Sequence, residues 1–169
     1  KISTDAIGEL LQVSGYYVYG LISTGTHLID TMRMLLTQRA GEVKWVSGWR
    51  FAPQHFHPPG DTNIDGVIGF ESGLKATVQS MNIKDYDFLE IDIFGRKGKA
   101  QCYGIGRRAA MYPVVASRIN SGFTEIADAP SDTWGPSEQS FFELMSRNVI
   151  DCLDGKSKPK STGSDSLMA

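Results

Sequence analysis

The fold of this chain is decided by residues 23–36, STGTHLIDTMRMLL, a short polar turn that opens directly into an amphipathic helix. At about 100° per residue, Ser23, His27 and Asp30 fall on one stripe of that helix. The inward surface is apolar and carries Leu28, Ile29, Met32, Leu35 and Leu36. We expect the helix to end near residues 36–38, before the next strand. A titratable imidazole near the start of a helix, with a carboxylate one turn later, is the strongest chemical signal in the sequence.

Length and composition indicate one globular domain. A chain of 169 residues is long enough for one domain with a proper core and too short for two. Its content of 41% hydrophobic and 21% charged residues is typical of a soluble, folded protein. A net charge of −2 provides no basic surface for nucleic acid, and the apolar runs are shorter than the roughly 20 residues that span a bilayer. We therefore expect neither a nucleic-acid partner nor a membrane partner.

The cysteines and histidines indicate no metal or redox centre. Cys102 and Cys152 form no metal or redox motif and no disulfide framework, which is typical of a reducing compartment and predicts a cytoplasmic protein. His55 and His57 invite a metal site with Asp61. Prolines follow them in a loop with no matching Cys or Glu, so loop polarity is the better interpretation and we expect no metal.

The remaining segments alternate between strands and turns. Residues 8–19 predict one long strand or two short ones broken at Gly15. Residues 104–134 lose periodicity and suggest an irregular edge strand and a long loop. Further strands are expected at 42–51, 64–71, 74–81, 87–94 and 99–103, and a second helix at 137–153. Residues 155–164 are expected to form a solvated linker.

The order of these elements predicts the α+β class. Strands joined by short hairpins, with helices near the two ends, imply a largely antiparallel open sheet with helices packed on one face. In the strand at 42–51, Trp45 and Trp49 point the same way. Aromatic residues on the open face favour contact between sheets, so we expect a homo-oligomer, a dimer or a tetramer, formed through that face.

The two ends suggest that residues 1–169 are a single domain excised from a longer protein. The chain begins at Lys1 without an initiator methionine or a signal segment, and residues 165–169 look like the first turn of a helix cut short.

Several motifs, taken in order, are similar to one known family. They are the run at 25–30 (GTHLID), the tryptophan strand after it, the hairpin at 68–73 (IGFESG), the turn at 94–98 (FGRKG) and the tail at 163–167 (GSDSL). From about Ala6 to Ala169 the chain resembles the C-terminal domain of the glucose–fructose oxidoreductase / inositol dehydrogenase / rhizopine catabolism (Gfo/Idh/MocA) oxidoreductases.

The resemblance implies a function that this chain shares with a missing domain. In the family, an N-terminal Rossmann domain binds NAD or NADP, and the C-terminal domain supplies one wall of the substrate cleft and the oligomer interface. Hydride transfer between the nicotinamide and a small-molecule substrate, a sugar, polyol or related hydroxy compound, is implied. The family's histidine maps onto His27, which would take or return the hydroxyl proton.

Two departures from the family bear on activity. The family often has an acidic residue four positions before the histidine, and here that position is Ser23. The family's Glu-Lys-Pro motif and the Gly-x-Gly-x-x-Gly of a dinucleotide site are both absent. We therefore expect this fragment alone to be inactive and to bind no cofactor. A catalytically silent sugar-binding or assembly domain of the same fold is the alternative.

The candidate site residues each have a structural alternative. His27 is either the proton carrier or a histidine that caps its own helix, and Asp30 is expected to be structural support for the site. Ser23 is a substrate contact or simply the helix N-cap. Arg50 would bind substrate hydroxyls if it faces the cleft, and is otherwise an arginine of the surface or sheet face.

Overall fold

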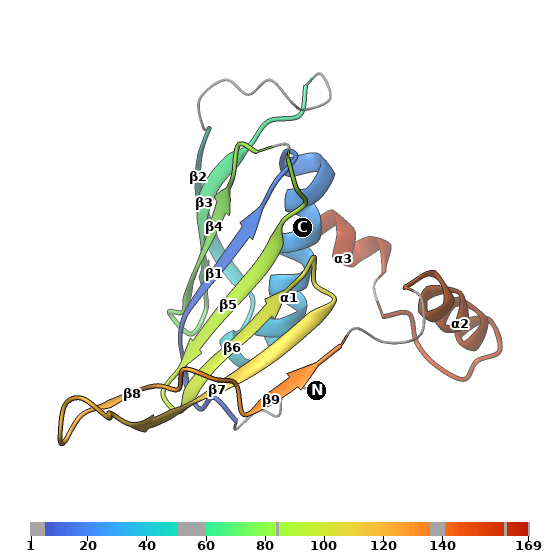
Figure 1. Ribbon diagram of the computed structural model, residues 1–169. Helices are drawn as coiled ribbons and strands as arrows, with labels where there is room; N and C mark the ends of the chain where they lie inside the picture. The colour runs from blue at the N-terminus through green and yellow to red at the C-terminus, as the bar shows by residue number, and fades with distance from the viewer. Residues whose placement is uncertain (1–5, 51–59, 84, 136–140, 161, 169) are drawn as a thin grey trace.

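The computed structural model describes residues 6–50, 60–83, 85–135, 141–160 and 162–168. Within these residues, one sheet carries the helical elements on a single side (Figure 1). The strands are β1 Leu10–Tyr17, β2 Val43–Arg50, β3 Ile64–Phe70, β4 Lys75–Ser80, β5 Leu89–Gly95, β6 Gly98–Tyr103, β7 Arg108–Ala116, β8 Thr124–Ile126 and β9 Asp132–Trp134. The helical elements are the π-helical turn η1 Leu21–Gly25, α1 Thr26–Ala40, α2 Phe141–Leu153 and α3 Gly163–Met168.

The sheet is antiparallel except at its centre. The strand order is β2-β3-β4-β1-β5-β6-β7-β8, and β9 also pairs with β7. Among the described strands, β1 and β4 form the parallel pair, because the chain leaves β1 through α1 and returns beside it only after the β2–β3 hairpin. The predicted α+β class with a largely antiparallel open sheet is confirmed.

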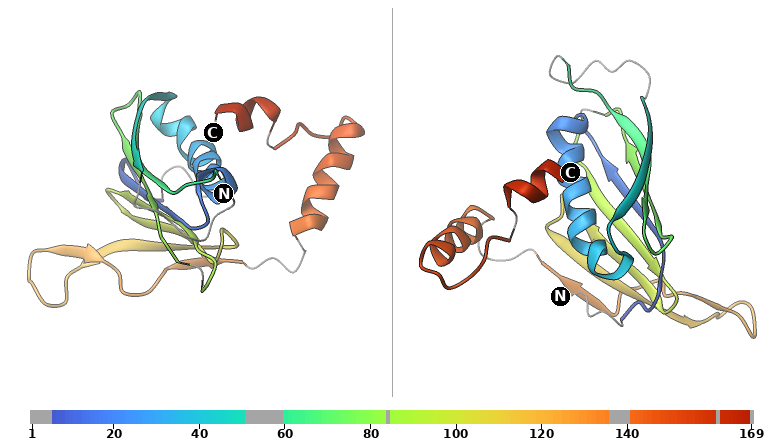
Figure 2. Two further views of the ribbon diagram at one scale, coloured as in Figure 1. Left: turned by 90° about the horizontal axis from the view of Figure 1, so that it is seen from above. Right: turned by 180° about the vertical axis from the view of Figure 1, so that it is seen from behind.

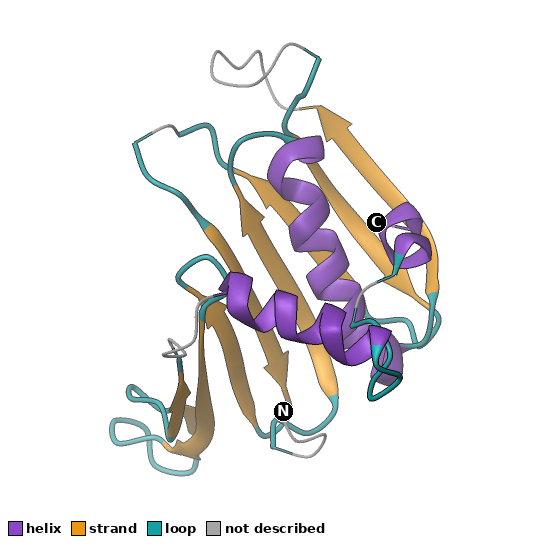
Figure 3. Ribbon diagram, turned by 90° about the vertical axis from the view of Figure 1, so that its right-hand side faces the viewer, coloured by secondary structure: helices purple, strands orange, loops and turns teal. Residues whose placement is uncertain are grey.

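Helix α1 packs across one face of this sheet and closes the core (Figures 2 and 3). Its buried side chains are Leu28, Met32, Leu36 and Ala40. Gly15 in β1 lies directly beneath the helix, where an added Cβ would stand only 2.7 Å from Met32 Sδ. The glycine therefore makes room for the helix, and β1 is one continuous strand and not two strands broken at Gly15.

The helical segment starts earlier and ends later than the hydrophobic pattern predicts. The turn η1 precedes α1 without a break, so helical backbone begins at Leu21. Gly25, between the two, is buried against Tyr17, whose Cε2 would lie 3.0 Å from an added Cβ. At the other end, α1 continues to Ala40 and stops at Gly41, whose φ of 76° favours glycine.

Residues 104–134 contain more regular structure than predicted. β7 is a nine-residue strand, and the short strands β8 and β9 both pair with it. A strand was predicted in this part of the chain and β7 is present, but the prediction of a long loop was wrong where β8 and β9 form. Strands of three residues carry too little alternation to be recognised from sequence.

The last two helices lie on the α1 side of the sheet. α3 contacts α1, whereas α2 stands away from the sheet (Figure 2). α3 begins at Gly163, inside the span expected for a linker. Within the described residues, no helix has the length and hydropathy needed to cross a membrane.

Candidate functional site

His27 and Ser23 lie on the side of the helical segment that faces away from the sheet. His27 is in the first turn of α1 and Ser23 is four residues earlier in η1, and both are exposed. The neighbouring Leu28 is completely buried and points into the core. The packing of the core thus fixes which face of the helix is exposed, and that face presents a hydroxyl and an imidazole one turn apart.

The His27 side chain is exposed on the first turn of α1. Within the described part of the chain, its ring makes no hydrogen bond or ion pair, and only its backbone carbonyl is engaged, accepting from Thr31 Oγ1 at 2.7 Å. An exposed imidazole with both nitrogens open can form a hydrogen bond to a bound molecule through either nitrogen. The structural alternative was that His27 caps its own helix. Among the described residues no side chain caps the start of α1, so this alternative does not hold.

Ser23 is not the helix N-cap. Gly20 is the N-cap of η1 and Gly25 is the N-cap of α1, because the π-helical turn extends the helical segment toward β1. The Ser23 hydroxyl therefore is not needed to cap the helix. It remains on the exposed face with His27, where a hydrogen bond to a bound hydroxyl compound is geometrically open.

Asp30 and Arg50 are not brought into contact with His27 by any described interaction. Asp30 is half-buried on α1, and within the described residues its carboxylate forms no hydrogen bond or ion pair. Arg50 is exposed at the end of β2, opposite Ile64 of β3. Strand alternation from Val46, which lines a cavity beneath α1, puts Arg50 on the helix side of the sheet, at the end where η1 begins. The predicted roles of both residues stay predictions.

Residues 61–63 hold the beginning of the helical segment through four consecutive backbone amides. The N–H of Gly20 donates to Asn63 Oδ1 at 2.8 Å, and the N–H of Leu21 donates to the Thr62 carbonyl at 2.9 Å. The next two, Ile22 and Ser23, donate to Asp61 Oδ1 and Oδ2, each at 2.9 Å. The four amides that a helix start leaves without an intrahelical acceptor are thus all satisfied by one short segment.

We call these four hydrogen bonds, from the amides of residues 20–23 to residues 61–63, the clamp. The clamp could not be predicted from the sequence. Asp61 and Ser23 are 38 residues apart, and their contact exists only because β3 begins beside η1. The sequence places Asp61 in a polar loop with His55 and His57, which lie outside the described residues. Among the residues that the structure describes, no group of three or more His, Cys, Asp or Glu side chains could hold a metal ion.

Tyr17 packs beneath Gly25 of η1 and forms hydrogen bonds to Ile64, the first residue of β3. Its side chain is fully buried, and its hydroxyl donates to the Ile64 carbonyl at 2.8 Å and accepts the Ile64 N–H at 2.9 Å. Burial raises the pKa of the Tyr17 phenol, so the group stays protonated well into the alkaline range. The first residue of β3 is thereby fixed beside the helix start.

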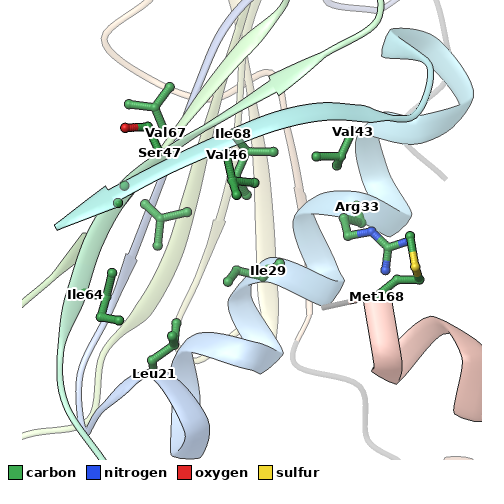
Figure 4. A pocket seen from close by; sticks show the side chains of 13 residues that line it. Leu21, Ile29, Arg33, Val43, Val46, Ser47, Ile64, Val67, Ile68 and Met168 are labelled. Carbon is green, nitrogen blue, oxygen red and sulfur yellow. The ribbon is translucent and has the colours of Figure 1, made fainter. Parts of the chain in front are cut away.

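An apolar cavity of about 230 Å³ lies between α1 and the strands β2 and β3 (Figure 4). Leu21 and Ile29 from the helical segment face Val46, Ile64 and other aliphatic side chains of the sheet. The lining is mostly aliphatic, with Arg33 near Met168 of α3, and neither His27 nor Ser23 belongs to it. The cavity is therefore separate from the face that carries those two residues.

Comparison with protein families gives a match over half of the chain. Residues 16–101 match the family model described as the GFO/IDH/MocA C-terminal domain. The matched span includes η1, α1 and strands β2 to β5, and therefore Ser23, His27 and Asp61. Among curated proteins, no sequence match was found.

Solved structures share the fold at low sequence identity. The WlbA dehydrogenase from Bordetella pertussis, solved with NADH and UDP-GlcNAcA, has a TM-score of 0.65 and 14% identity, over 99% of this chain and 50% of that chain. Levoglucosan dehydrogenase, solved with NADH and L-sorbose, has a TM-score of 0.65 and 15% identity, over 96% and 54%. A super-repressor mutant of Gal80p from Saccharomyces cerevisiae has a TM-score of 0.64 and 12% identity, over 94% and 49%. The chain thus spans about half the length of these structures.

Proposed function

Because the chain belongs to the GFO/IDH/MocA family of oxidoreductases, as its C-terminal domain, we propose that it is the substrate-side half of an NAD(P)-dependent dehydrogenase. The substrate would be a sugar, polyol or related hydroxy compound, and the domain would supply one wall of the cleft that binds it. The observation that carries this proposal is the unpaired His27 imidazole on the exposed face of α1, inside the span that matches the family.

The dinucleotide itself does not fit the residues described here. A dinucleotide cradle needs a glycine-rich turn between a strand and a helix of a parallel βαβ unit. β1 and β4 are the parallel pair in the described sheet, and the connection after β1 is the π-helical turn η1. We therefore assign NAD or NADP, which would accept or donate the hydride, to a separate N-terminal domain of a longer parent chain.

The roles of this chain concern the substrate hydroxyl. His27 would hold the substrate oxygen by a hydrogen bond and take its proton as the C–H bond breaks and the carbonyl forms, and return that proton in the reverse direction. Ser23 Oγ and the Arg50 guanidinium would bind neighbouring hydroxyls, and Asp30 would support the helix face around the imidazole.

Cys102 and Cys152 are half-buried and form no disulfide with each other, which supports a cytoplasmic location.

Replacing His27 with alanine in the full-length protein tests the proposal. We expect turnover, followed as NAD(P)H formation on a panel of sugars, polyols and nucleotide sugars, to fall by about 10²-fold or more. Gln38→Ala is the matched control, because Gln38 is exposed and three turns further along the same face of α1. Equal turnover of His27→Ala and the parent would contradict a catalytic role for His27.

A second candidate is a catalytically silent sugar-binding or assembly domain. It is favoured by Ser23, which leaves no carboxylate one turn before His27, and by the similarity to Gal80p, whose solved form is described as a super-repressor. Under this alternative the full-length protein would bind sugars in a calorimetric titration but produce no NAD(P)H with any of them. Turnover that depends on His27 would exclude it.

We also propose that the domain forms a dimer or tetramer through the sheet face opposite α1. Trp45 and Trp49 lie on that face, 42% and 53% exposed, and α1, α2 and α3 all lie on the other side (Figure 3). Lys99 and Asp92 form a partly buried ion pair there at 2.8 Å, with the ammonium 5.3 Å from the centre of the Phe94 ring. An aromatic surface on which one ion pair is already formed within the chain is suited to contact with a second copy.

A further inference from the structure

We propose that Asp61 is a positioning residue for the site on α1: its carboxylate grips the amides of Ile22 and Ser23 and so sets the direction in which Ser23 and His27 project. This inference rests on the proposed function only in so far as His27 acts on a substrate. The hydrogen bonds from the amides of Ile22 and Ser23 to Asp61 can be measured without any turnover.

A carboxylate is the group that this position requires. Its two oxygens accept from two consecutive N–H groups, at 2.9 Å each, and both groups point out of the start of a helix. The negative charge also lies at the positive end of the helix dipole. An asparagine of the same shape would turn its NH₂ toward one of these amides, so one of the two hydrogen bonds would be lost.

The absence of a side chain at Gly20 leaves room for the Asp61 carboxylate. Its φ of 89° lies in the region that favours glycine, and a Cβ at this position would overlap the carboxyl group of Asp61. The side chain of Asn63 then completes the contact from the other side, because its Oδ1 accepts the Gly20 N–H at 2.8 Å while the residue is fully buried. The clamp is therefore anchored in the core through Asn63 and reaches the exposed face through Asp61.

The segment that the clamp holds is a π-helical turn, a rare arrangement that persists where the surroundings fix it. The surroundings here are Tyr17, against which Gly25 is buried, and residues 61–63, which bind the first amides of the turn. Ser23 is held directly through its amide, and His27 follows it by one turn of continuous helix. If η1 relaxes, both side chains shift together, and an error of about 1 Å in the position of a catalytic group costs about 10²-fold in rate.

Asp61→Asn in the full-length protein tests the inference, with Glu71→Gln as the matched control. Glu71 is a carboxylate that accepts a backbone N–H, that of Glu42 at 3.2 Å, just beyond the opposite end of α1. Amide hydrogen exchange would be measured for both variants, together with the ring signals of His27 by NMR and the steady-state kinetics.

For Asp61→Asn we expect amide exchange at Ile22 and Ser23 to accelerate by at least about tenfold, while the amides of β1 and of the last turn of α1 stay protected. The His27 ring signals should shift, and kcat should fall by about 10- to 100-fold with KM changed by less than about threefold. Glu71→Gln should leave the His27 signals in place and kcat within about twofold.

Two results would overturn the inference. One is faster exchange at Ile22 and Ser23 with unmoved His27 signals, because the clamp would then not position the imidazole. The other is a loss of kcat without faster exchange, because Asp61 would then act by another route. Should the parent protein show no His27-dependent turnover, the proposed function fails, and the exchange and ring signals still decide whether Asp61 positions His27.

Discussion

At the scale of single residues, Tyr17 links stability to pH. Its hydroxyl makes two hydrogen bonds to Ile64 in a fully buried position, and burial raises the pKa of the phenol above its ordinary value of 10.0. The folded chain therefore keeps this proton to a higher pH than the unfolded chain does. The contribution of Tyr17 to the free energy of unfolding is complete below about pH 10 and is lost as the pH rises through the folded-state pKa.

Tyr17→Phe should lower the free energy of unfolding at neutral pH by about 1–3 kcal/mol, because the backbone N–H and C=O of Ile64 lose a buried partner. The same variant should lose less stability than the parent between about pH 10 and pH 11, since the titrating phenol is gone. Urea denaturation at about pH 7 and about pH 11 measures both effects. Tyr86→Phe, at an exposed tyrosine, should match the parent at both pH values; an equally steep alkaline loss in Tyr17→Phe would contradict the linkage.

The candidate site was partly predictable at this scale. His27 could be singled out because a titratable side chain on the exposed stripe of a helix is visible in the order of residues alone, and its catalytic role stays a prediction. Of the two interpretations of Ser23, the helix N-cap does not hold, because the helical segment begins earlier, where η1 packs on Tyr17 and binds residues 61–63; the substrate contact stays a prediction. Asp61 could not be found, because its partners are brought to it by the pairing of distant strands.

At the scale of elements, the contact between β1 and α1 depends on the absence of a side chain at Gly15. A Cβ there would lie 2.7 Å from Met32 Sδ and 3.0 Å from Leu28 Cδ1, and both of those residues are fully buried. Both atoms belong to flexible side chains, so the contact can adjust in part. Alanine would also reduce the conformational freedom that the unfolded chain has at this position, which by itself favours the folded strand.

Gly15→Ala should therefore lower the free energy of unfolding by about 1–2 kcal/mol, because overpacking outweighs the entropic gain. Equilibrium unfolding in guanidinium chloride measures the change. Gly163→Ala is the control, since nothing lies within 4 Å of a Cβ added at Gly163; it should change the free energy by less than about 0.5 kcal/mol. A stabilised Gly15→Ala variant would mean that α1 packs less closely on β1.

The same contact explains why element boundaries were predicted less well than element types. Glycine within a strand pattern ordinarily signals a bulge or a break, and here packing against α1 overrides that signal. The strands β8 and β9 were missed for a different reason, since they have three residues each. β7 was expected only as an irregular edge strand, because Pro113 interrupts its pattern. Long periodic segments such as α1 and β2 were recognised because their patterns repeat several times.

At the scale of the whole molecule, the two faces of the sheet differ in what covers them. The apolar residues of the sheet that face α1 are buried in a single core, and the opposite face carries Trp45 and Trp49 in contact with solvent. The alternation of β2 predicted that Trp45 and Trp49 share one side of the strand, but not which side the helices cover. The outer face is therefore the surface on which assembly can be tested without altering the core.

Trp49→Lys should weaken self-association of the full-length protein by at least tenfold. A tryptophan buried at the centre of an interface is among the side chains whose loss costs most, and a lysine there would introduce an unpaired charge. Light scattering coupled to size-exclusion chromatography should give two or four times the protomer mass for the parent and a shift toward the monomer for the variant. Ile119→Lys, at an exposed position in the loop between β7 and β8, should keep the mass of the parent. A parent protein that stays monomeric at high concentration, or a Trp49→Lys variant that keeps the mass of the parent, would contradict assembly through this face.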